Sequence, residues 1–266
     1  CYHSPTMRIA MGIEYDGSDF CGWQRQQTGR TVQGCLEHAV ASVADHELSV
    51  VCAGRTDTGV HATAQVIHFD SGAERSSRSW VLGSNARLPA DVRVQWAQPV
   101  DEAFHARFEA RRRHYRYVIL NRDQASALLH KRVCREYADI DVCRMREAAT
   151  HLTGEHDFTS FRAVACQAKS PVRTVYQLDV TRQGQFVYLD ISANAFLHHM
   201  VRCIAGVLLS IGRGDRHPAW AREILDARDR TQGGVTAPAG GLYLVAVRYP
   251  SRYGIPDRGW LPAFGS

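Results

Sequence analysis

Residues 53–62, AGRTDTGVHA, place a single carboxylate, Asp57, on a segment rich in residues that favour turns. Gly54 and Gly59 flank the acid, and glycine permits backbone conformations and close ligand approaches that other residues resist. The apolar run 48–52 comes just before, which predicts a loop at the end of a strand, where functional groups are often displayed. We therefore expect Asp57 to be the catalytic group, although in an arbitrary sequence such an acid more often only bonds its own backbone.

A basic and aromatic stretch lies further along the chain. Residues 107–116 contain five arginines and His114, interleaved with Phe108, Tyr115 and Tyr117. This combination is typical of nucleic-acid binding, because cations contact phosphates and rings stack on bases. The formal net charge of +5 alone indicates only a mild preference for anionic partners. The competing interpretation of this stretch is a solvated basic edge strand.

The composition is that of a globular protein, with 45% hydrophobic and 22% charged residues in a chain of 266. The eight cysteines include no close CxxC pair and no Cys/His ligand spacing, so we expect reduced thiols and no structural zinc site. The longest apolar run, residues 203–211, is too short to span a bilayer. These features favour a cytoplasmic protein without a membrane segment.

Hydrophobic periodicity predicts strands and helices in two groups. Residues 8–15 alternate as a half-buried strand does, and residues 31–43 carry an apolar stripe at helical spacing with Thr31 as the N-cap. Further strands are expected at 48–52, 65–69, 92–99, 113–120, 172–180, 186–192 and 242–248, and further helices at 79–87, 140–152, 197–211 and 218–226. Such runs of strands with paired helices favour an α+β fold over a doubly wound parallel sheet.

The segment around Asp57 resembles the catalytic motif of the tRNA pseudouridine synthase A family, whose nucleophile is the aspartate of a Gly-Arg-Thr-Asp-x-Gly-Val-His run. Other segments resemble the same family in the same order, and together they extend from about Met7 to about Pro250. These segments are residues 15–18, 22–26, 31–34, 104–108, 115–117, 154–161, 196–202, 236–238 and 241–244. So many ordered matches do not arise by chance.

This resemblance implies a fold and a division of the chain. The expected fold is α+β, with two RRM-like or ferredoxin-like halves that share a mostly antiparallel central sheet, helices packed on one side and a cleft between the halves. We expect the N-terminal half, with the catalytic loop, at residues 7–107 and the C-terminal half at residues 108–250. Residues 251–266 form a C-terminal tail, and residues 1–6 are expected to be a vector-derived remnant or a disordered extension.

The resemblance also implies an activity, the isomerisation of uridine to pseudouridine at positions 38, 39 and 40 of the tRNA anticodon stem-loop. The reaction breaks the C1′–N1 bond and forms a C1′–C5 bond without net oxidation, so no cofactor and no metal are expected. Asp57 is the implied nucleophile. Attack on C1′, attack on C6 and removal of the 2′ proton all remain open as its chemical step. A homodimer is implied as well, with one tRNA lying across both subunits.

Three more residues match positions of the family's active site. Tyr115 is expected to stack on the target uracil and to help remove the C5 proton, whereas Tyr117 is expected to pack in the core. Arg202 is expected to form an ion pair with Asp57, because a carboxylate in a desolvated site stays ionised only beside a cation. Helical spacing directs Arg202 away from the apolar stripe of its helix. Leu242 matches a residue that packs against the site.

Arginines complete the expected substrate-binding surface. Arg55, beside the nucleophile, is expected to contact the RNA backbone or to fill the space left by a flipped base. Extracting a base costs a few kcal/mol, and stacking returns roughly 1–3 kcal/mol per base. The other arginines that we expect to contact RNA are Arg25, Arg107, Arg111 and Arg113.

Other functions compete for the same residues. A metal hydrolase that uses Asp57 with His61, His68, His198 and His199 is disfavoured, because adjacent histidines point to different helix faces and no His-x-x-x-His motif is present. A noncatalytic RNA-binding module would not need a glycine-framed acid. A related pseudouridine synthase with another RNA target stays open, because shape and basic surface set specificity.

Three residues depart from the family's pattern. Cys21 stands where an aromatic residue or histidine is expected, Cys203 stands where asparagine is usual, and Gly240 replaces a larger residue. None of these positions is one of the expected catalytic residues. The departures therefore concern local RNA contacts and packing rather than the class of reaction.

Overall fold

The computed structural model describes residues 6–163, 166 and 168–264. Most of the expected N-terminal extension, residues 1–5, lies outside the described residues. The chain divides into two compact units. Unit 1 consists of Cys1–Arg111 and Leu244–Leu261, and unit 2 consists of Arg112–Tyr243 and Pro262–Ser266. The expected boundaries at residues 107 and 250 stay predictions, because compact units need not coincide with repeated halves.

Unit 1 is built on an antiparallel sheet. Its strands lie in the order β4-β1-β3-β10, and β2 pairs with β3. The pairs β1/β3, β1/β4 and β2/β3 are all antiparallel. The strands are β1 (Met7–Tyr15), β2 (Val51–Cys52), β3 (His61–Ser71), β4 (Val92–Val100) and β10 (Leu242–Arg248), of which β10 contributes its residues from Leu244 onward.

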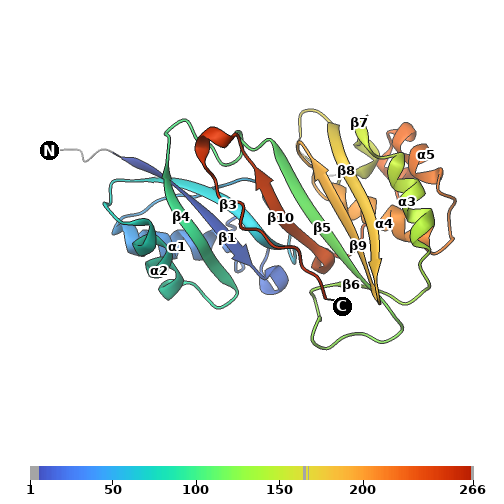
Figure 1. The fold of residues 1–266 in the computed structure, drawn as a ribbon, viewed down its shortest axis with the longest axis horizontal. Coiled ribbons are helices and arrows are strands. Elements are labelled where there is room, and N and C mark those ends of the chain that lie inside the picture. The colour runs from blue at the N-terminus through green and yellow to red at the C-terminus, as the bar shows by residue number, and fades with distance from the viewer. Residues whose placement is uncertain (1–5, 164–165, 167, 265–266) are drawn as a thin grey trace. The chain divides into compact units, whose positions relative to one another are not determined.

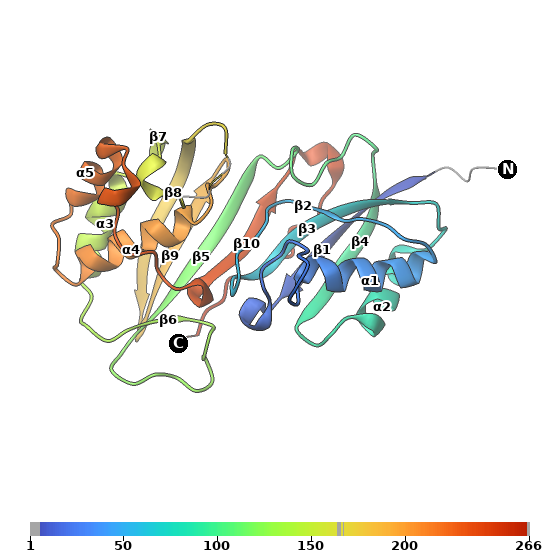
Figure 2. The same cartoon turned by 180° about the vertical axis from the view of Figure 1, so that it is seen from behind.

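Two helices, α1 (Val32–Ala44) and α2 (Ser77–Arg87), cover one face of the unit 1 sheet (Figures 1 and 2). The Thr31 side chain accepts a hydrogen bond from the Gly34 backbone N–H, which confirms the expected N-cap of α1. The apolar stripe of α1 is buried, and the Trp80 ring of α2 packs edge-on against Phe69, with ring centroids 5.2 Å apart. Burial of these side chains fixes the helices on the sheet.

The C-terminal segment crosses the opposite face of the same sheet (Figure 1). The Thr63 hydroxyl donates to the Trp260 carbonyl oxygen over 2.8 Å, and the Trp260 indole N–H donates to a Glu14 carboxylate oxygen over 2.9 Å. Gly259 passes so close to the Val245 carbonyl that a Cβ atom at this position would overlap the oxygen. Both faces of the unit 1 sheet are therefore in contact with other parts of the chain.

The strands of unit 2 lie in the order β5-β9-β8-β7, and β6 pairs with β5. The pairs β5/β9, β8/β9 and β7/β8 are antiparallel, whereas β5/β6 is parallel. The strands are β5 (Arg112–Asn121), β6 (Cys134–Glu136), β7 (Gly154–Asp157), β8 (Val172–Gln183) and β9 (Phe186–Ala193).

Helices α3 (Val142–Thr150), α4 (Met200–Gly212) and α5 (Trp220–Ala227) lie on one face of the unit 2 sheet (Figure 2). Helix α4 is buried on nearly all sides, and its expected apolar stripe is confirmed. With five helices and mostly antiparallel strands in the described part of the chain, the α+β prediction is confirmed. Within these residues, no helix is both long and apolar enough to cross a membrane.

Most expected elements form within a few residues of their predicted bounds, and the differences have local causes. Helix α4 begins at Met200 rather than at Leu197, because His199 adopts a left-handed backbone conformation with φ 64°. Strand β3 begins four residues earlier than expected, at His61. The short strands β6 and β7 were not predicted.

Candidate active site

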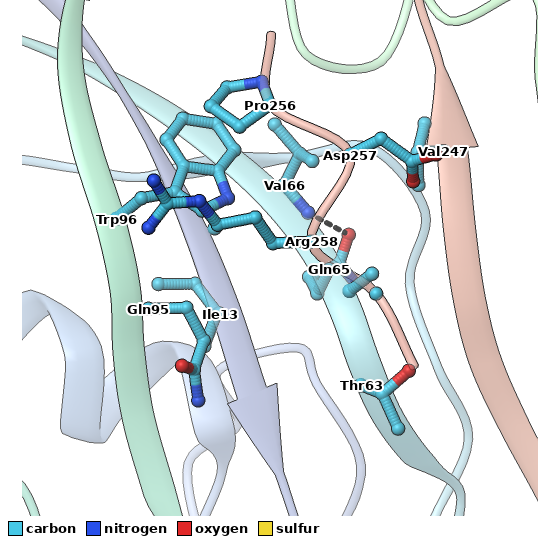
Figure 3. Close-up of a pocket in the computed structure, with 13 residues that line it drawn as sticks. Ile13, Thr63, Gln65, Val66, Gln95, Trp96, Val247, Pro256, Asp257 and Arg258 are labelled. Atoms are coloured by element: carbon cyan, nitrogen blue, oxygen red, sulfur yellow. Dashed lines mark hydrogen bonds between the residues drawn. The ribbon is translucent and has the colours of Figure 1, made fainter. Parts of the chain in front are cut away.

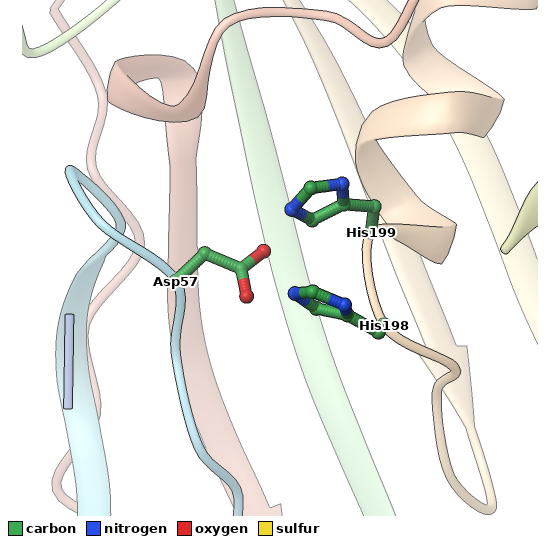
Figure 4. Close-up of side chains that lie close together, drawn as sticks. All are labelled: Asp57, His198 and His199. Atoms are coloured by element: carbon green, nitrogen blue, oxygen red, sulfur yellow. The ribbon is translucent and has the colours of Figure 1, made fainter. Parts of the chain in front are cut away.

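Asp57 lies on the loop that joins β2 to β3 in unit 1, as expected for a displayed carboxylate (Figure 4). Its side chain is half-buried. The Val60 N–H donates to the Asp57 carbonyl oxygen over 3.1 Å and closes a turn. Gly59 occupies this turn with φ 79°, in the region where a side chain would be strained. The glycine after the acid is therefore required by the shape of the loop.

Thr56, directly before the acid, is fixed by both its side chain and its backbone. Its hydroxyl and the Tyr15 hydroxyl share a 2.7 Å hydrogen bond, and both residues are buried, with Thr56 7% and Tyr15 3% exposed. The Trp23 N–H donates to the Thr56 carbonyl oxygen over 3.0 Å. A Cβ atom at Gly22 would lie only 3.0 Å from that oxygen. The segments around Tyr15 and Gly22 therefore position the loop of Asp57, a role that was not predicted for them from the sequence.

The far end of the loop is held by His61. Its Nδ1 atom lies 3.0 Å from the Gly17 backbone nitrogen and 3.1 Å from an Asp16 carboxylate oxygen. The hydrogen bond with His61 holds the pKa of Asp16 well below its usual value, although partial burial opposes the shift. Gly17 also packs directly under the Val60 backbone. These contacts give His61 a structural role.

Two of the expected RNA-binding arginines lie near the same buried thiol in unit 1. Burial raises the pKa of Cys52 to about 12, and the charges of Arg55 and Arg107 partly oppose this shift. Both arginines are exposed. The structure thus brings two cations to one neighbourhood, and Arg55 is two residues from Asp57 along the chain.

The other two arginines of unit 1 that we expect to bind RNA, Arg25 and Arg111, make different contacts. Arg25 is exposed, and its guanidinium donates to Glu37 over 3.3 Å. Arg111 is exposed as well, and its backbone N–H donates to the Arg248 carbonyl oxygen over 2.8 Å. The backbone of Arg111 is therefore fixed, while its side chain faces solvent.

In unit 2, the two tyrosines of β5 have different surroundings. Tyr115 is 8% exposed, and its ring meets Phe196 edge-on with centroids 5.1 Å apart. Tyr117 is fully buried, and its hydroxyl donates to the Pro238 carbonyl oxygen over 2.7 Å. Burial raises the pKa of Tyr117 well above its usual value. These contacts agree with the packing role expected for Tyr117.

Arg202 is half-buried on α4 and is held by the segment before β10. Its Nε donates to the Ala237 carbonyl oxygen over 2.8 Å, and the Ala237 N–H donates to the Arg202 carbonyl oxygen over 3.0 Å. A Cβ atom at Gly206 would overlap the Val235 carbonyl oxygen, so this segment lies directly on α4. Arg202 is thus a positioned side chain rather than a solvated one. Leu242, at the start of β10, is buried as expected.

His198 and His199 precede α4 in unit 2, and their rings lie with centroids 4.1 Å apart (Figure 4). Arg113 lies at the start of β5 in the same unit. Its guanidinium donates to the Asn194 carbonyl oxygen over 2.9 Å. The Arg113 side chain therefore has a structural contact in addition to its expected role in RNA binding.

A pocket in unit 1 lies apart from the expected site residues (Figure 3). Trp96 and Gln65 of the sheet line one side, and Pro256 and Arg258 of the C-terminal segment line the other. None of the residues expected to act on the substrate lines this pocket. The pocket is the space that remains where the C-terminal segment packs on the sheet.

The hydrogen bond between Tyr15 and Thr56 predicts a coupled effect on stability and turnover. We expect Thr56→Val and Tyr15→Phe each to lower the free energy of unfolding by about 1–3 kcal/mol, because each removes one partner of a buried bond. Turnover should fall by up to about 100-fold, since the loop of Asp57 loses a restraint. Denaturant unfolding and single-turnover assays measure both effects.

The double variant is expected to be less destabilised than the sum of the two single variants, because it removes both polar groups together. Thr56→Ser keeps the hydroxyl and serves as the matched control, with near wild-type turnover. Additive losses in the double variant would show that the two hydroxyls act independently.

Comparison with known proteins identifies the class to which this fold and site belong. The sequence profile of a family described as tRNA pseudouridine synthase matches residues 11–109 and 148–250, which together make up more than half of the chain. The chain therefore belongs to the tRNA pseudouridine synthase family, a class of isomerases. This confirms the family expectation.

Curated relatives match nearly full length and carry the more specific name tRNA pseudouridine synthase A. The protein of Nitrosococcus oceani is 58% identical over 250 residues, covering 94% of this chain and 96% of its own. That of Alcanivorax borkumensis is 54% identical, covering 96% and 97%, respectively. That of Vibrio cholerae is 51% identical, covering 97% and 98%.

Proposed function

We propose that the protein isomerises uridine to pseudouridine at positions 38, 39 and 40 of the tRNA anticodon stem-loop, with Asp57 as nucleophile. The observation that best supports this proposal is the loop of Asp57. One half-buried carboxylate stands on a turn whose two ends are fixed by buried hydrogen bonds. Such restraint is what a nucleophile needs to meet a bound base in one orientation.

The resemblance to the family implies the roles of the other residues. The Tyr115 ring stacks on the target uracil, and its hydroxyl assists removal of the C5 proton. The Arg202 guanidinium keeps the Asp57 carboxylate ionised, and Leu242 packs against the site. The reaction conserves atoms and oxidation state, so it proceeds without cofactor or metal. The chemistry is compatible with Asp57 attacking C1′ or C6, or removing the 2′ proton.

The positive charge of five arginines and the resemblance to the family support binding of tRNA. Arg55 contacts the RNA backbone or fills the space left by the flipped base. The other arginines that contact the RNA are Arg25, Arg107, Arg111 and Arg113. The protein acts as a homodimer in the cytoplasm, and the anticodon stem-loop of one tRNA lies across both subunits.

The decisive experiment incubates the purified protein with an unmodified tRNA carrying uridines at positions 38, 39 and 40, and maps pseudouridine at single-nucleotide resolution. Product at these positions supports the proposal. Product only at other positions would keep the reaction and overturn the target. Tight binding without product would favour a noncatalytic RNA-binding module.

Removal of the Arg111 charge in Arg111→Ala is expected to weaken tRNA binding and to make it less dependent on salt. Each phosphate that the protein no longer neutralises lowers the slope of log affinity against log salt by about 0.7–0.9. Arg113→Ala should act in the same direction. Arg87→Ala, an exposed arginine at the end of α2, is the matched control. Titrations of tRNA binding from low to high salt measure this slope. If both variants kept the wild-type slope, the basic stretch would be a solvated edge strand that does not bind RNA.

A further inference from the structure

Phe108 is an aromatic ring exposed to solvent on the segment between β4 and β5. It is 72% exposed, which is unusual for a large apolar side chain. Its ring stacks on the imidazole of His105, with centroids 4.2 Å apart and planes inclined by 29°. The ring therefore has a flat support behind it while most of its surface faces solvent.

The imidazole behind Phe108 is held by two hydrogen bonds and a ring contact. The Nδ1 atom of His105 accepts hydrogen bonds from the backbone N–H groups of Arg107 and Phe108, each over 3.2 Å. The His105 ring also packs against the buried ring of His68, with centroids 4.8 Å apart. Burial lowers the pKa of His105, and the nearby charges of Arg8 and Arg107 lower it further. The imidazole is therefore neutral at physiological pH and is oriented by the backbone.

One arginine lies beside this ring, and a second follows it in the sequence. The Arg107 guanidinium carbon lies 5.7 Å from the centroid of Phe108, and Arg111 is exposed three residues further along. The acid that follows the ring in sequence, Glu109, is paired with Arg252 over 2.9 Å. An aromatic ring beside cations is the combination that binds the base and the phosphates of one nucleotide.

We propose that Phe108, supported by His105 and flanked by Arg107 and Arg111, is a platform on which an unpaired nucleobase of the substrate tRNA stacks. This inference rests on the proposed function, since it needs tRNA as the ligand. The platform binds and positions RNA and takes no part in the chemical step. An apolar peptide would use the ring without needing the flanking cations, so nucleic acid is the occupant that the surface favours.

Substitution at Phe108 tests the platform directly. We expect Phe108→Ala to weaken tRNA binding by roughly 5- to 150-fold, the effect of losing one stacked base. Phe108→Leu should lose most of the same affinity, because it keeps apolar area but no aromatic face, whereas Phe108→Tyr should bind like the wild type. Leu82→Ala, which truncates another exposed apolar side chain of unit 1, is the control and should have no effect. Wild-type affinity in Phe108→Ala or Phe108→Leu would overturn the proposal.

Two further measurements separate stacking from other effects. Phe108→Ala should keep the wild-type salt slope, because it removes no charge, and should keep the single-turnover rate at saturating tRNA. In Phe108→Trp, addition of tRNA should quench the fluorescence gained over the wild type, and absence of quenching would contradict stacking. If Phe108→Ala binds normally while the wild-type protein still forms pseudouridine, the platform fails and the proposed function stands. If no uridine is converted by the wild type, the proposed function fails whatever Phe108 does.

Discussion

Pseudouridine formation should be lost in Asp57→Asn, while tRNA binding stays close to that of the wild type. Asparagine has nearly the same shape, but its amide neither attacks carbon nor removes a proton at neutral pH. We expect turnover to fall by about 10⁴-fold or more. The contacts of Thr56 and His61 that fix the loop are kept in this variant, so the loop should keep its conformation. Single-turnover assays and binding titrations measure the two properties separately.

A matched control is Asp139→Asn, which removes an exposed carboxylate from unit 2 and should leave turnover unchanged. Normal turnover in Asp57→Asn would show that another group is the nucleophile. Loss of both binding and thermal stability would instead show that Asp57 is needed for folding. Melting curves of the variant distinguish the second case from loss of chemistry alone.

Neutralising Arg202 is expected to have the second-largest effect. Arg202→Gln should lower turnover by about 100- to 1,000-fold, because a preorganised charge in a desolvated site contributes about this much. Arg202→Lys keeps the charge but loses the planar guanidinium whose Nε bonds Ala237. Its turnover should therefore lie between those of Arg202→Gln and the wild type. Single-turnover rates at saturating tRNA provide the comparison.

The control for Arg202 is Arg222→Gln on α5, where an exposed arginine pairs with Asp226 on the same helix. Exposed ion pairs contribute little to the free energy of unfolding, so this variant should have the stability and the turnover of the wild type. If Arg202→Gln turned over normally but melted at a lower temperature, Arg202 would serve only to anchor the segment at Ala237.

Secondary structure was predictable wherever side-chain periodicity was strong. The alternation in β1 and the apolar stripe of α4 predicted the type of each element, although the structure buries both faces of β1 between Ile9 and Ile13 and nearly all sides of α4. Strand β7, with the sequence GEHD, carries no such pattern. Strand β6 is only three residues long. Both form because a neighbouring strand supplies hydrogen bonds, and a local pattern contains no information about that neighbour.

In the candidate site, too, local features were predictable from the sequence and contacts between distant residues were not. Asp57 was identified from the composition of its own loop, because glycines and an acid in that order are local information. The bond from Tyr15 to Thr56 joins residues 41 positions apart, and the bond from Arg202 to Ala237 joins residues 35 positions apart. No local rule connects such pairs, because their contact depends on how strands and helices pack. Sequence reasoning therefore led to Asp57 as the proposed nucleophile, but not to the residues that hold its loop.

The return of the chain to unit 1 has a consequence for biosynthesis. Residues Leu244–Leu261 belong to unit 1, yet a ribosome makes them only after all of Arg112–Tyr243. During translation, the edge of β3 and one face of the first sheet therefore stay uncovered until β10 and the C-terminal segment have been made. Unpaired strand edges favour aggregation, and contacts between distant segments form slowly. The first unit is thus expected to be prone to aggregation until residues 244–261 have been made.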